Sequence, residues 1–306
     1  MLKKIIALIV CLVAILNFTG CSQSNQQQTN VNTAGKMQIC VTFNAMKEFA
    51  EAVGGDKVAI STIIPDGSEP HDFEPKAKDL AGLSTARVFI YNGLGMEAWV
   101  KEAVAAADNK DLIVVEASKG AALIVIGTDQ DQLGEQGSYD PHLWLSLKGA
   151  EVEVKNIKDA LVKADPSNRE YYEKNYADYN AKLESLYNEY HEKFKSVHKK
   201  SFVTGHAAFA YLCRDFGLTQ HSVEDVYAEG EPSAKQLGQL IDYCKKNNTT
   251  TIFTEEMASP AVSETLANAV GAKVQAIYTM ESAEDDKTYL ERMEDNLSKI
   301  YVSLAD

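Results

Sequence analysis

The chain has 306 residues, of which 30 are Lys or Arg and 44 are Asp or Glu, so its formal net charge is −14 at pH 7. This acidic balance comes without a basic stripe, and it therefore lacks the electrostatic footprint of a nucleic-acid-binding protein. The five cysteines include no C-x-x-C pair and give no disulfide framework. We expect Cys40, Cys213 and Cys244 to be buried apolar residues, with a bridge between the last two left open.

The first 20 residues are typical of a signal peptide. Two lysines precede an apolar run over residues 5–16, which is shorter than the roughly 20 residues that a membrane-spanning helix needs. The segment NFTGC, which ends at Cys21, resembles a bacterial lipobox and implies a lipid on the Cys21 sulfur. A plain secretory signal with an incidental cysteine is the alternative. Residues 21–36 then form the lipidated cysteine and a flexible tether rich in Gln, Asn, Ser and Thr.

Residues 37–166 alternate short apolar runs with helical segments. This β-α-β-α order predicts a parallel sheet that helices cover on both faces. We therefore assign these residues to an N-terminal α/β lobe. Its expected strands cover residues 38–43, 58–64, 87–91 and 112–115, and its expected helices include residues 46–53 and 96–107.

Residues 167–198 are predicted to form one long connecting helix. Pro166 lies where the first turn of a helix tolerates proline, and tyrosine and leucine side chains recur along the segment at helical spacing. At 1.5 Å per residue such a helix would be roughly 45 Å long, which is enough to run along two lobes. The aromatic stripe is interpreted as a packing surface.

Residues 199–306 return to the α/β pattern and are assigned to a C-terminal lobe. The predicted fold class is therefore α/β, with two similar lobes that have parallel-type sheets and are joined by one long helix. The expected strands of the second lobe cover residues 201–204, 250–253 and 273–278, and its expected helices cover residues 207–216, 233–247, 259–270 and 286–304.

Three of the six histidines lie in short loops near predicted strand ends. His71 follows the strand at residues 58–64, His142 lies in the segment DPHLWLS, and His206 follows the strand at residues 201–204. Ligands bind beyond the carboxyl ends of strands in open α/β sheets, and histidine is the commonest side chain that binds transition metals. These three histidines therefore indicate a metal site. His191, His198 and His221 receive no ligand role, and the first two are expected on the long helix.

The segments GSEPHDFEP, DPHLWLS and TGHAAFAYL together resemble the metal-ligand segments of a known family. This is the family of zinc/manganese solute-binding lipoproteins of ABC transporters, also named cluster 9 or cluster A-I. The resemblance runs through nearly the whole chain after the tether. It implies one metal ion held in the cleft between two lobes, with His71 and His142 from the first lobe and His206 from the second.

The fourth ligand is less clear from the sequence. The resembled family commonly places a carboxylate, often Asp, on the loop after a late strand, and here that loop contains Glu281. We therefore expect Glu281 to complete the site. The alternatives are Glu255, Glu256, Glu69 and a water molecule.

The predicted donor set favours zinc over manganese. Three imidazoles and one carboxylate suit Zn²⁺ at about 2.0 to 2.2 Å, whereas Mn²⁺ favours more carboxylate and water ligands. Within the resembled family, histidine at the position of His206 is likewise typical of zinc-binding members. The loop over residues 127–140 lacks the histidine-rich insertion that some members carry, so its acidic side chains would be at most a weak electrostatic attraction for cations.

The predicted function is extracytoplasmic capture of a divalent transition metal, with Zn²⁺ first and Mn²⁺ second, and its delivery to an ABC permease and its ATPase for import. The protein would be a monomer, held at the outer face of the cytoplasmic membrane by the lipid on Cys21. The sequence contains none of the signatures H-E-x-x-H or G-x-S-x-G, so an enzyme is not expected. A surface adhesin or structural lipoprotein, in which a metal only stabilises the fold, is the alternative.

Overall fold

The structure is a computed structural model that describes residues 35–126, 139–227, 232–255 and 260–305. The described residues belong to one compact unit that begins at Gly35. The predicted signal peptide, Cys21, residues 127–138 of the acidic loop and Glu256 lie outside the described residues. Within the described part, no helix has both the length and the apolar content that crossing a membrane requires.

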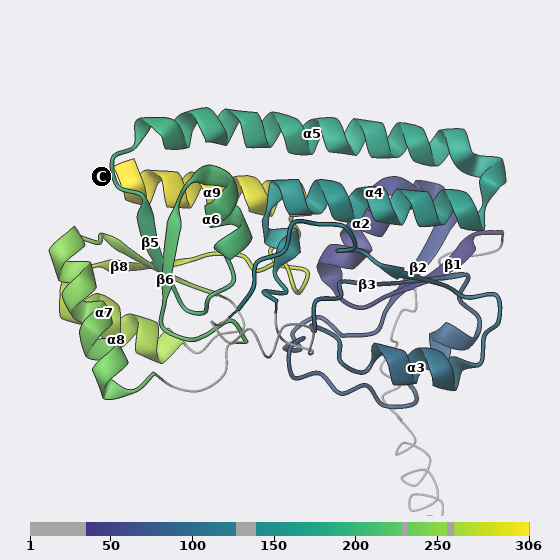
Figure 1. Cartoon of the computed structure of the whole chain (residues 1–306), viewed down its shortest axis with the longest axis horizontal. Coiled ribbons are helices and arrows are strands. Elements are labelled where there is room, and N and C mark those ends of the chain that lie inside the picture. The colour runs from purple at the N-terminus through teal and green to yellow at the C-terminus, as the bar shows by residue number, and fades with distance from the viewer. Residues whose placement is uncertain (1–34, 127–138, 228–231, 256–259, 306) are drawn as a thin grey trace, which may run out of the picture. The chain divides into compact units, whose positions relative to one another are not determined.

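The first half of this unit is built on a four-stranded parallel sheet with the order β2-β1-β3-β4. Its core residues lie on both faces of the sheet, because helices pack on both sides (Figure 1). The strands are β1 (Met37–Val41), β2 (Val58–Thr62), β3 (Val88–Tyr91) and β4 (Ile113–Glu116), and the helices are α2 (Asn44–Gly54), α3 (Val100–Ala107) and α4 (Leu147–Ala164). We call this half the first lobe.

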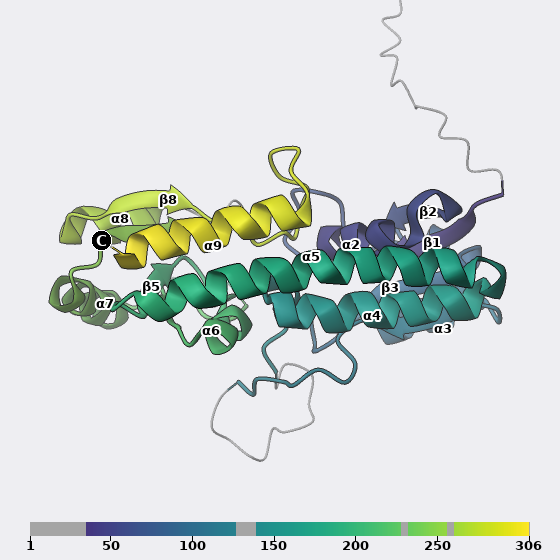
Figure 2. The same ribbon diagram turned by 90° about the horizontal axis from the view of Figure 1, so that it is seen from above.

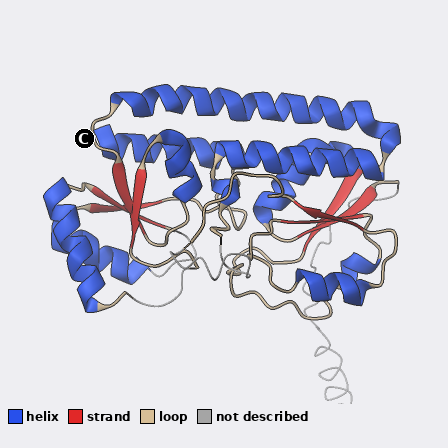
Figure 3. Cartoon of the chain, in the orientation of Figure 1, coloured by secondary structure: helices blue, strands red, loops and turns tan. Residues whose placement is uncertain are grey.

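The second half has the same architecture, with a parallel sheet of order β6-β5-β7-β8. Figure 3 shows the two sheets in red, each with helices around it. The strands are β5 (Ser201–Thr204), β6 (Thr219–Ser222), β7 (Thr251–Thr254) and β8 (Lys273–Ala276), and the helices are α6 (Ala210–Phe216), α7 (Ala234–Asn247), α8 (Pro260–Val270) and α9 (Tyr289–Ala305). We call this half the second lobe. The predicted fold class is thus confirmed.

The long helix α5 (Arg169–Ser196) packs against α2 and α4 of the first lobe and against α6 and α9 of the second lobe (Figures 1 and 2). Tyr172, Leu183, Tyr190 and Phe194 are its buried residues, and they join one hydrophobic core that includes residues of both lobes. The predicted aromatic stripe is therefore a packing surface. Exposed ion pairs four residues apart, such as Lys174 with Asp178, lie on its outer face and add a few tenths of a kcal/mol each.

Two details differ from the sequence-based expectations. The helix α5 ends at Ser196, where Val197 adopts an extended conformation, so His198 lies beyond it. Strand β6 was not predicted, because its sequence TQHS contains no apolar residue and it lies at the edge of the sheet. Cys40, Cys213 and Cys244 are buried as expected, and all three are free, so Cys213 and Cys244 form no bridge. Burial raises the pKa of the Cys213 thiol.

Candidate metal centre

The carboxyl ends of several parallel strands bring the predicted ligands to one place. His206 lies two residues after β5, and Glu281 lies in the loop after β8. From the first lobe, His71 follows β2, and His142 precedes a short 3-10 helix (Leu143–Leu145) that leads into α4. Ser146 caps α4 by accepting a hydrogen bond from the Gly149 N–H at 2.9 Å, which fixes where the His142 segment ends.

The four side chains converge on a single point. One possible ligand atom from each of His71, His142, His206 and Glu281 lies within 4.8 Å of the other three. The Nε2 atom of His142 is 3.1 Å from Nε2 of His71 and 3.4 Å from Nε2 of His206. Nitrogen ligands at about 2.0 to 2.1 Å from a tetrahedral Zn²⁺ are separated by about 3.3 Å. The spacing of the histidines therefore matches a tetrahedral metal site.

Burial keeps the three imidazoles neutral. His142 is fully buried, His206 is 4% exposed, and His71 is half-buried. Burial lowers the pKa of His71 and of His142 to about 3, with repulsion from His142 adding to the effect on His71. Burial likewise holds the pKa of His206 well below its usual range. Neutral imidazole is the form that binds a metal ion, so the three histidines can accept one at neutral pH without releasing a proton.

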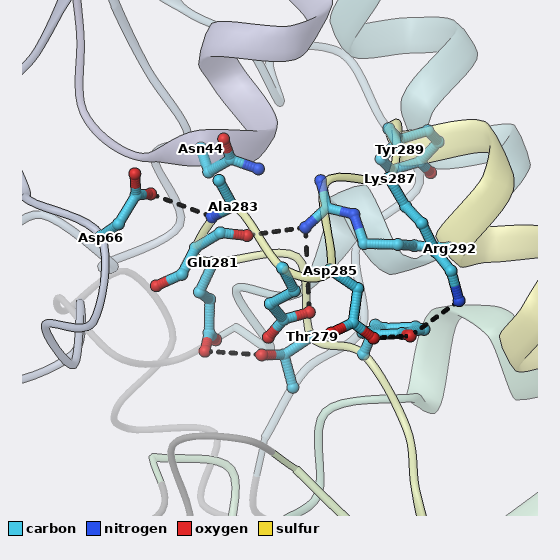
Figure 4. A network of polar contacts seen from close by, with 12 residues as sticks. Asn44, Asp66, Thr279, Glu281, Ala283, Asp285, Lys287, Tyr289 and Arg292 are labelled. Carbon is cyan, nitrogen blue, oxygen red and sulfur yellow. Dashed lines mark hydrogen bonds and ion pairs between the residues drawn. The ribbon is translucent and has the colours of Figure 1, made fainter.

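Glu281 has one carboxyl oxygen that is free to bind a metal ion. Its Oε2 atom accepts a hydrogen bond from the Thr279 hydroxyl at 2.8 Å (Figure 4), whereas its buried Oε1 atom has no hydrogen-bond partner among the described residues. Burial raises the pKa of Glu281 to about 8, and Glu69 adds to this effect. Without a metal this carboxyl group therefore keeps its proton at neutral pH, and a cation beside the histidines would stabilise its ionised form and give Oε1 a partner.

Asp140 orients His142, a role that could not be predicted from the sequence. Its Oδ1 atom lies 3.0 Å from Nδ1 of His142 and also accepts the His142 backbone N–H at 2.9 Å. Burial raises the pKa of Asp140 to about 7. A carboxylate that accepts the Nδ1 proton leaves the lone pair on Nε2, which faces the other ligands. Its position two residues before His142 was the only signal in the sequence.

Glu255, an alternative fourth ligand, lies behind His206 and outside the four-residue cluster. Its Oε1 atom accepts the His206 backbone N–H at 3.3 Å and lies 3.7 Å from Nδ1 of His206. Gly205 makes this approach possible, because a Cβ atom there would collide with the Glu255 carboxylate. Burial raises the pKa of Glu255 to about 8. Glu255 therefore supports a histidine instead of completing the cluster.

Glu69, the other described alternative, also supports a histidine. Its Oε1 atom accepts the His71 backbone N–H at 3.2 Å, and the four-residue cluster among the described residues contains Glu281 in its place. Three imidazoles and one carboxylate, nearly all buried, can hold a borderline transition metal in a closed shell. The fold and this site together define a two-lobed metal-binding protein.

Comparison with known proteins places the chain in a family. Residues 39–302 match the family model of the periplasmic zinc-uptake complex component A, ZnuA. The high-affinity zinc uptake system protein ZnuA of Bacillus subtilis (strain 168) is 37% identical over 315 residues, which cover 99% of each chain. A protein of Treponema pallidum (strain Nichols) is 42% identical and covers 96% of this chain and 95% of its own length. The chain belongs to the ZnuA family of zinc-uptake solute-binding proteins, which serve transport and are not enzymes.

Solved structures agree in fold. The zinc-bound ZnuA-like domain of Streptococcus pneumoniae AdcA is 35% identical, has a TM-score of 0.76, and covers 89% of this chain and all of that domain. The laminin-binding adhesin Lmb of Streptococcus agalactiae, in a mutant form, is 34% identical with a TM-score of 0.81, and covers 88% of this chain and 99% of that one. The chain spans 60% of the full zinc-binding lipoprotein AdcA of S. pneumoniae (strain R6), to which it is 37% identical.

Proposed function

We propose that this protein captures Zn²⁺ outside the cytoplasm with His71, His142, His206 and Glu281 and delivers it to an ABC permease powered by a cytoplasmic ATPase. The observation that carries this proposal is the convergence of three neutral imidazoles and one unpartnered carboxylate oxygen within 4.8 Å. Membership of a zinc-uptake family supports the transport role. We propose further that the protein acts as a monomer.

The donor set supports zinc as the cargo. Four side-chain donors complete a tetrahedral shell of the size that Zn²⁺ takes. Mn²⁺ prefers oxygen-rich shells with water, and three imidazoles offer it a poor match. We expect zinc to bind much more tightly than manganese, although the Irving–Williams order alone already favours zinc. The informative result would therefore be a ratio of zinc to manganese affinity much larger than the Irving–Williams order alone gives.

The alternative of a purely structural metal receives less support. Both lobes have hydrophobic cores that do not include the metal ligands, and the largest of these cores joins the two lobes through α5. A small domain that needs a metal to fold typically lacks such a core. The metal-free protein is therefore expected to remain folded, which a carrier that releases its cargo requires.

We propose separately that a lipid on Cys21 anchors the protein to the membrane. A lipid on Cys21 would hold the protein at the outer face of the cytoplasmic membrane, and the tether at residues 22–36 would let it reach a permease. Cys21→Ser should move the protein from the membrane fraction to the soluble fraction of the source cells. A Cys21→Ser protein that stays in the membrane fraction would contradict the lipid anchor.

The experiment that tests the cargo is a competition titration of the purified protein against a chromophoric chelator, with Zn²⁺ and then Mn²⁺. We expect one zinc site, lost in His142→Ala and weakened in Glu281→Gln. His191→Ala is the matched control, because His191 lies on α5 against Tyr187, outside the cluster. Zinc binding of normal strength in both His142→Ala and Glu281→Gln would contradict the proposed site.

The delivery step is tested in cells. A strain without this protein should accumulate less zinc from zinc-limited medium, and the wild-type protein should restore uptake whereas His142→Ala should not. Restoration by His142→Ala would show that delivery does not depend on the proposed site.

A further inference from the structure

The loop that carries Glu281 begins in the second lobe but is attached to the first. We call residues 279–288, between β8 and α9, the Glu281 loop. It forms hydrogen bonds with residues of α2, of the loop between β2 and His71, and of the segment directly after His142. Two of its carbonyls accept hydrogen bonds: the Trp144 indole N–H donates to the Thr279 carbonyl at 2.7 Å, and the Asn44 N–H donates to the Glu281 carbonyl at 3.2 Å. The Gly67 N–H donates to the Ser282 hydroxyl at 2.9 Å. The Ala283 N–H donates to Asp66 Oδ1, also at 2.9 Å.

Arg292 adds a further attachment, and its guanidinium group lies beside the Glu281 loop (Figure 4). Its side chain is fully buried at the start of α9. One guanidinium nitrogen donates to the Ser282 carbonyl at 2.6 Å and lies 3.8 Å from the Glu284 carboxylate. The other terminal nitrogen forms an ion pair with Oε1 of Glu48 in α2. The guanidinium fork therefore joins the peptide next to Glu281 to a helix of the first lobe.

Glu48 also bonds to a residue in its own helix and to the first residue of α9. Its Oε1 atom also accepts from the Asn44 side chain at 2.6 Å, and its Oε2 atom accepts the Tyr289 N–H. Asn44, which holds the Glu281 carbonyl, lies one helical turn before Glu48 in α2. The carbonyls of Glu281 and Ser282 are thus both held by groups attached to the first turns of α2. Moving the Glu281 backbone away from the first lobe would therefore break the contacts to Asn44 and Arg292.

We propose that Arg292 is a positioning residue for zinc binding, which acts by holding Glu281 against the first lobe. This inference rests on the proposed function. In this arrangement three of the four ligands, His71, His142 and Glu281, are held in place by the first lobe. Only His206 is held by the second lobe. Arginine suits this task because its planar fork holds two acceptors at once, whereas lysine offers a single ammonium group.

Lys287 provides a matched control in the same loop. Its ammonium group donates to the Tyr278 hydroxyl at 2.9 Å and lies 3.4 Å from Asp295 in α9. These partners belong to the second lobe, and the Lys287 side chain is 38% exposed. Lys287→Gln therefore removes a cation from the Glu281 loop without touching its attachment to the first lobe.

The test is a double-mutant cycle on zinc affinity. The Zn²⁺ dissociation constant is measured for the purified wild-type protein, Arg292→Lys, Glu281→Gln and the double variant, at a temperature where circular dichroism shows each to be folded. Groups that orient metal ligands typically contribute 10-fold to 100-fold in affinity. We expect Arg292→Lys to weaken zinc binding at least 10-fold with Glu281 present and less than threefold with Glu281→Gln, while Lys287→Gln changes it less than twofold. Glu48→Gln, a second variant that keeps the arginine, should follow the same pattern.

Two results would overturn the inference. The first is an equal loss from Arg292→Lys with and without Glu281, because a general loosening of the fold would not depend on that ligand. The second is an unchanged affinity in folded Arg292→Lys or folded Glu48→Gln. Wild-type affinity in Glu281→Gln alone is a different failure, because it would refute the proposed ligand itself and with it the role of Arg292.

Discussion

Nδ1 of His142 lies 3.0 Å from Oδ1 of Asp140, and both side chains are buried. Asp140 is further held by helix α6 of the second lobe, because the Tyr211 hydroxyl donates to the Asp140 carbonyl at 2.8 Å. The contact decides which imidazole nitrogen carries the proton. It therefore links a residue that never touches the metal to the chemistry of the site.

Asp140→Asn should weaken zinc binding about 10-fold to 100-fold. An amide side chain can turn its N–H₂ group toward Nδ1, and this would favour the tautomer whose proton lies on Nε2, where the metal must bind. The competition titration described above measures the change. Asp178→Asn, in an exposed ion pair on α5, is the control and should bind zinc normally. Equal affinities for Asp140→Asn and the wild-type protein would show that Asp140 does not set the tautomer.

Glu153→Gln should stabilise the metal-free protein, and more so at pH 8 than at pH 5. Both carboxylate oxygens of Glu153 in α4 lack a hydrogen-bond partner among the described residues. Burial, and then the nearby Glu97, raises the pKa of Glu153 well above its ordinary value of 4.5. The folded state thus keeps a proton that the unfolded chain releases above that value, and its stability falls as the pH rises.

The measurement is urea unfolding of wild type and Glu153→Gln across this pH range. Because only the wild-type protein keeps the buried titratable carboxyl group at residue 153, the difference in unfolding free energy should grow steadily between pH 5 and pH 8. A difference that stays constant with pH, or shrinks as the pH rises, would contradict the raised pKa. Glu97 is present in both proteins, and burial raises its pKa to about 7. It therefore makes the stability of both proteins fall as the pH rises, and this shared effect cancels in the difference.

Tyr289→Phe should lower the unfolding free energy by about 1 to 3 kcal/mol. The buried Tyr289 hydroxyl donates to the Trp144 carbonyl at 2.6 Å, and its loss would leave that carbonyl unpaired beside the Glu281 loop. Chemical denaturation in the presence of a chelator measures the effect. Tyr171→Phe is the control, since its hydroxyl accepts the Asp56 N–H at an exposed site at 3.3 Å. Equal losses in the two variants would mean that burial of the bond does not matter.

Removal of zinc with a chelator should leave the protein folded but less stable. A ligand that binds only the folded state at 1,000 times its dissociation constant adds about 4 kcal/mol. Thermal unfolding followed by circular dichroism should therefore show the same helical signal before and after chelation, with a lower melting temperature after it. Loss of the helical signal at 25 °C would favour a structural metal over a carried one.

Much of the site could be predicted from the sequence, because the histidines follow recognisable strands. His206 comes two residues after the apolar strand β5, and parallel strands end at a common edge. The choice among carboxylates was harder. Glu255 and Glu281 both follow strands of the second sheet, and only the path of each loop decides that one lies behind His206 whereas the other joins the histidines.

The parts that escaped prediction depend on contacts between distant segments. Strand β6 pairs with β5 through its backbone, and its polar sequence gives no sign of this. Arg292 appears in the sequence as one charged residue in an amphipathic helix, yet it is fully buried because Glu48, 244 residues away in the chain, pairs with it. Periodicity cannot reveal an ion pair of this separation.

The most direct test of the central claim is X-ray absorption at the zinc edge of the protein loaded with one equivalent of Zn²⁺. We expect four nitrogen or oxygen neighbours at about 2.0 to 2.2 Å, with the outer scattering of three imidazoles. In His206→Ala the imidazole count should fall to two. A sulfur neighbour at about 2.3 Å, or fewer than three imidazoles in the wild-type protein, would contradict the site formed by His71, His142, His206 and Glu281.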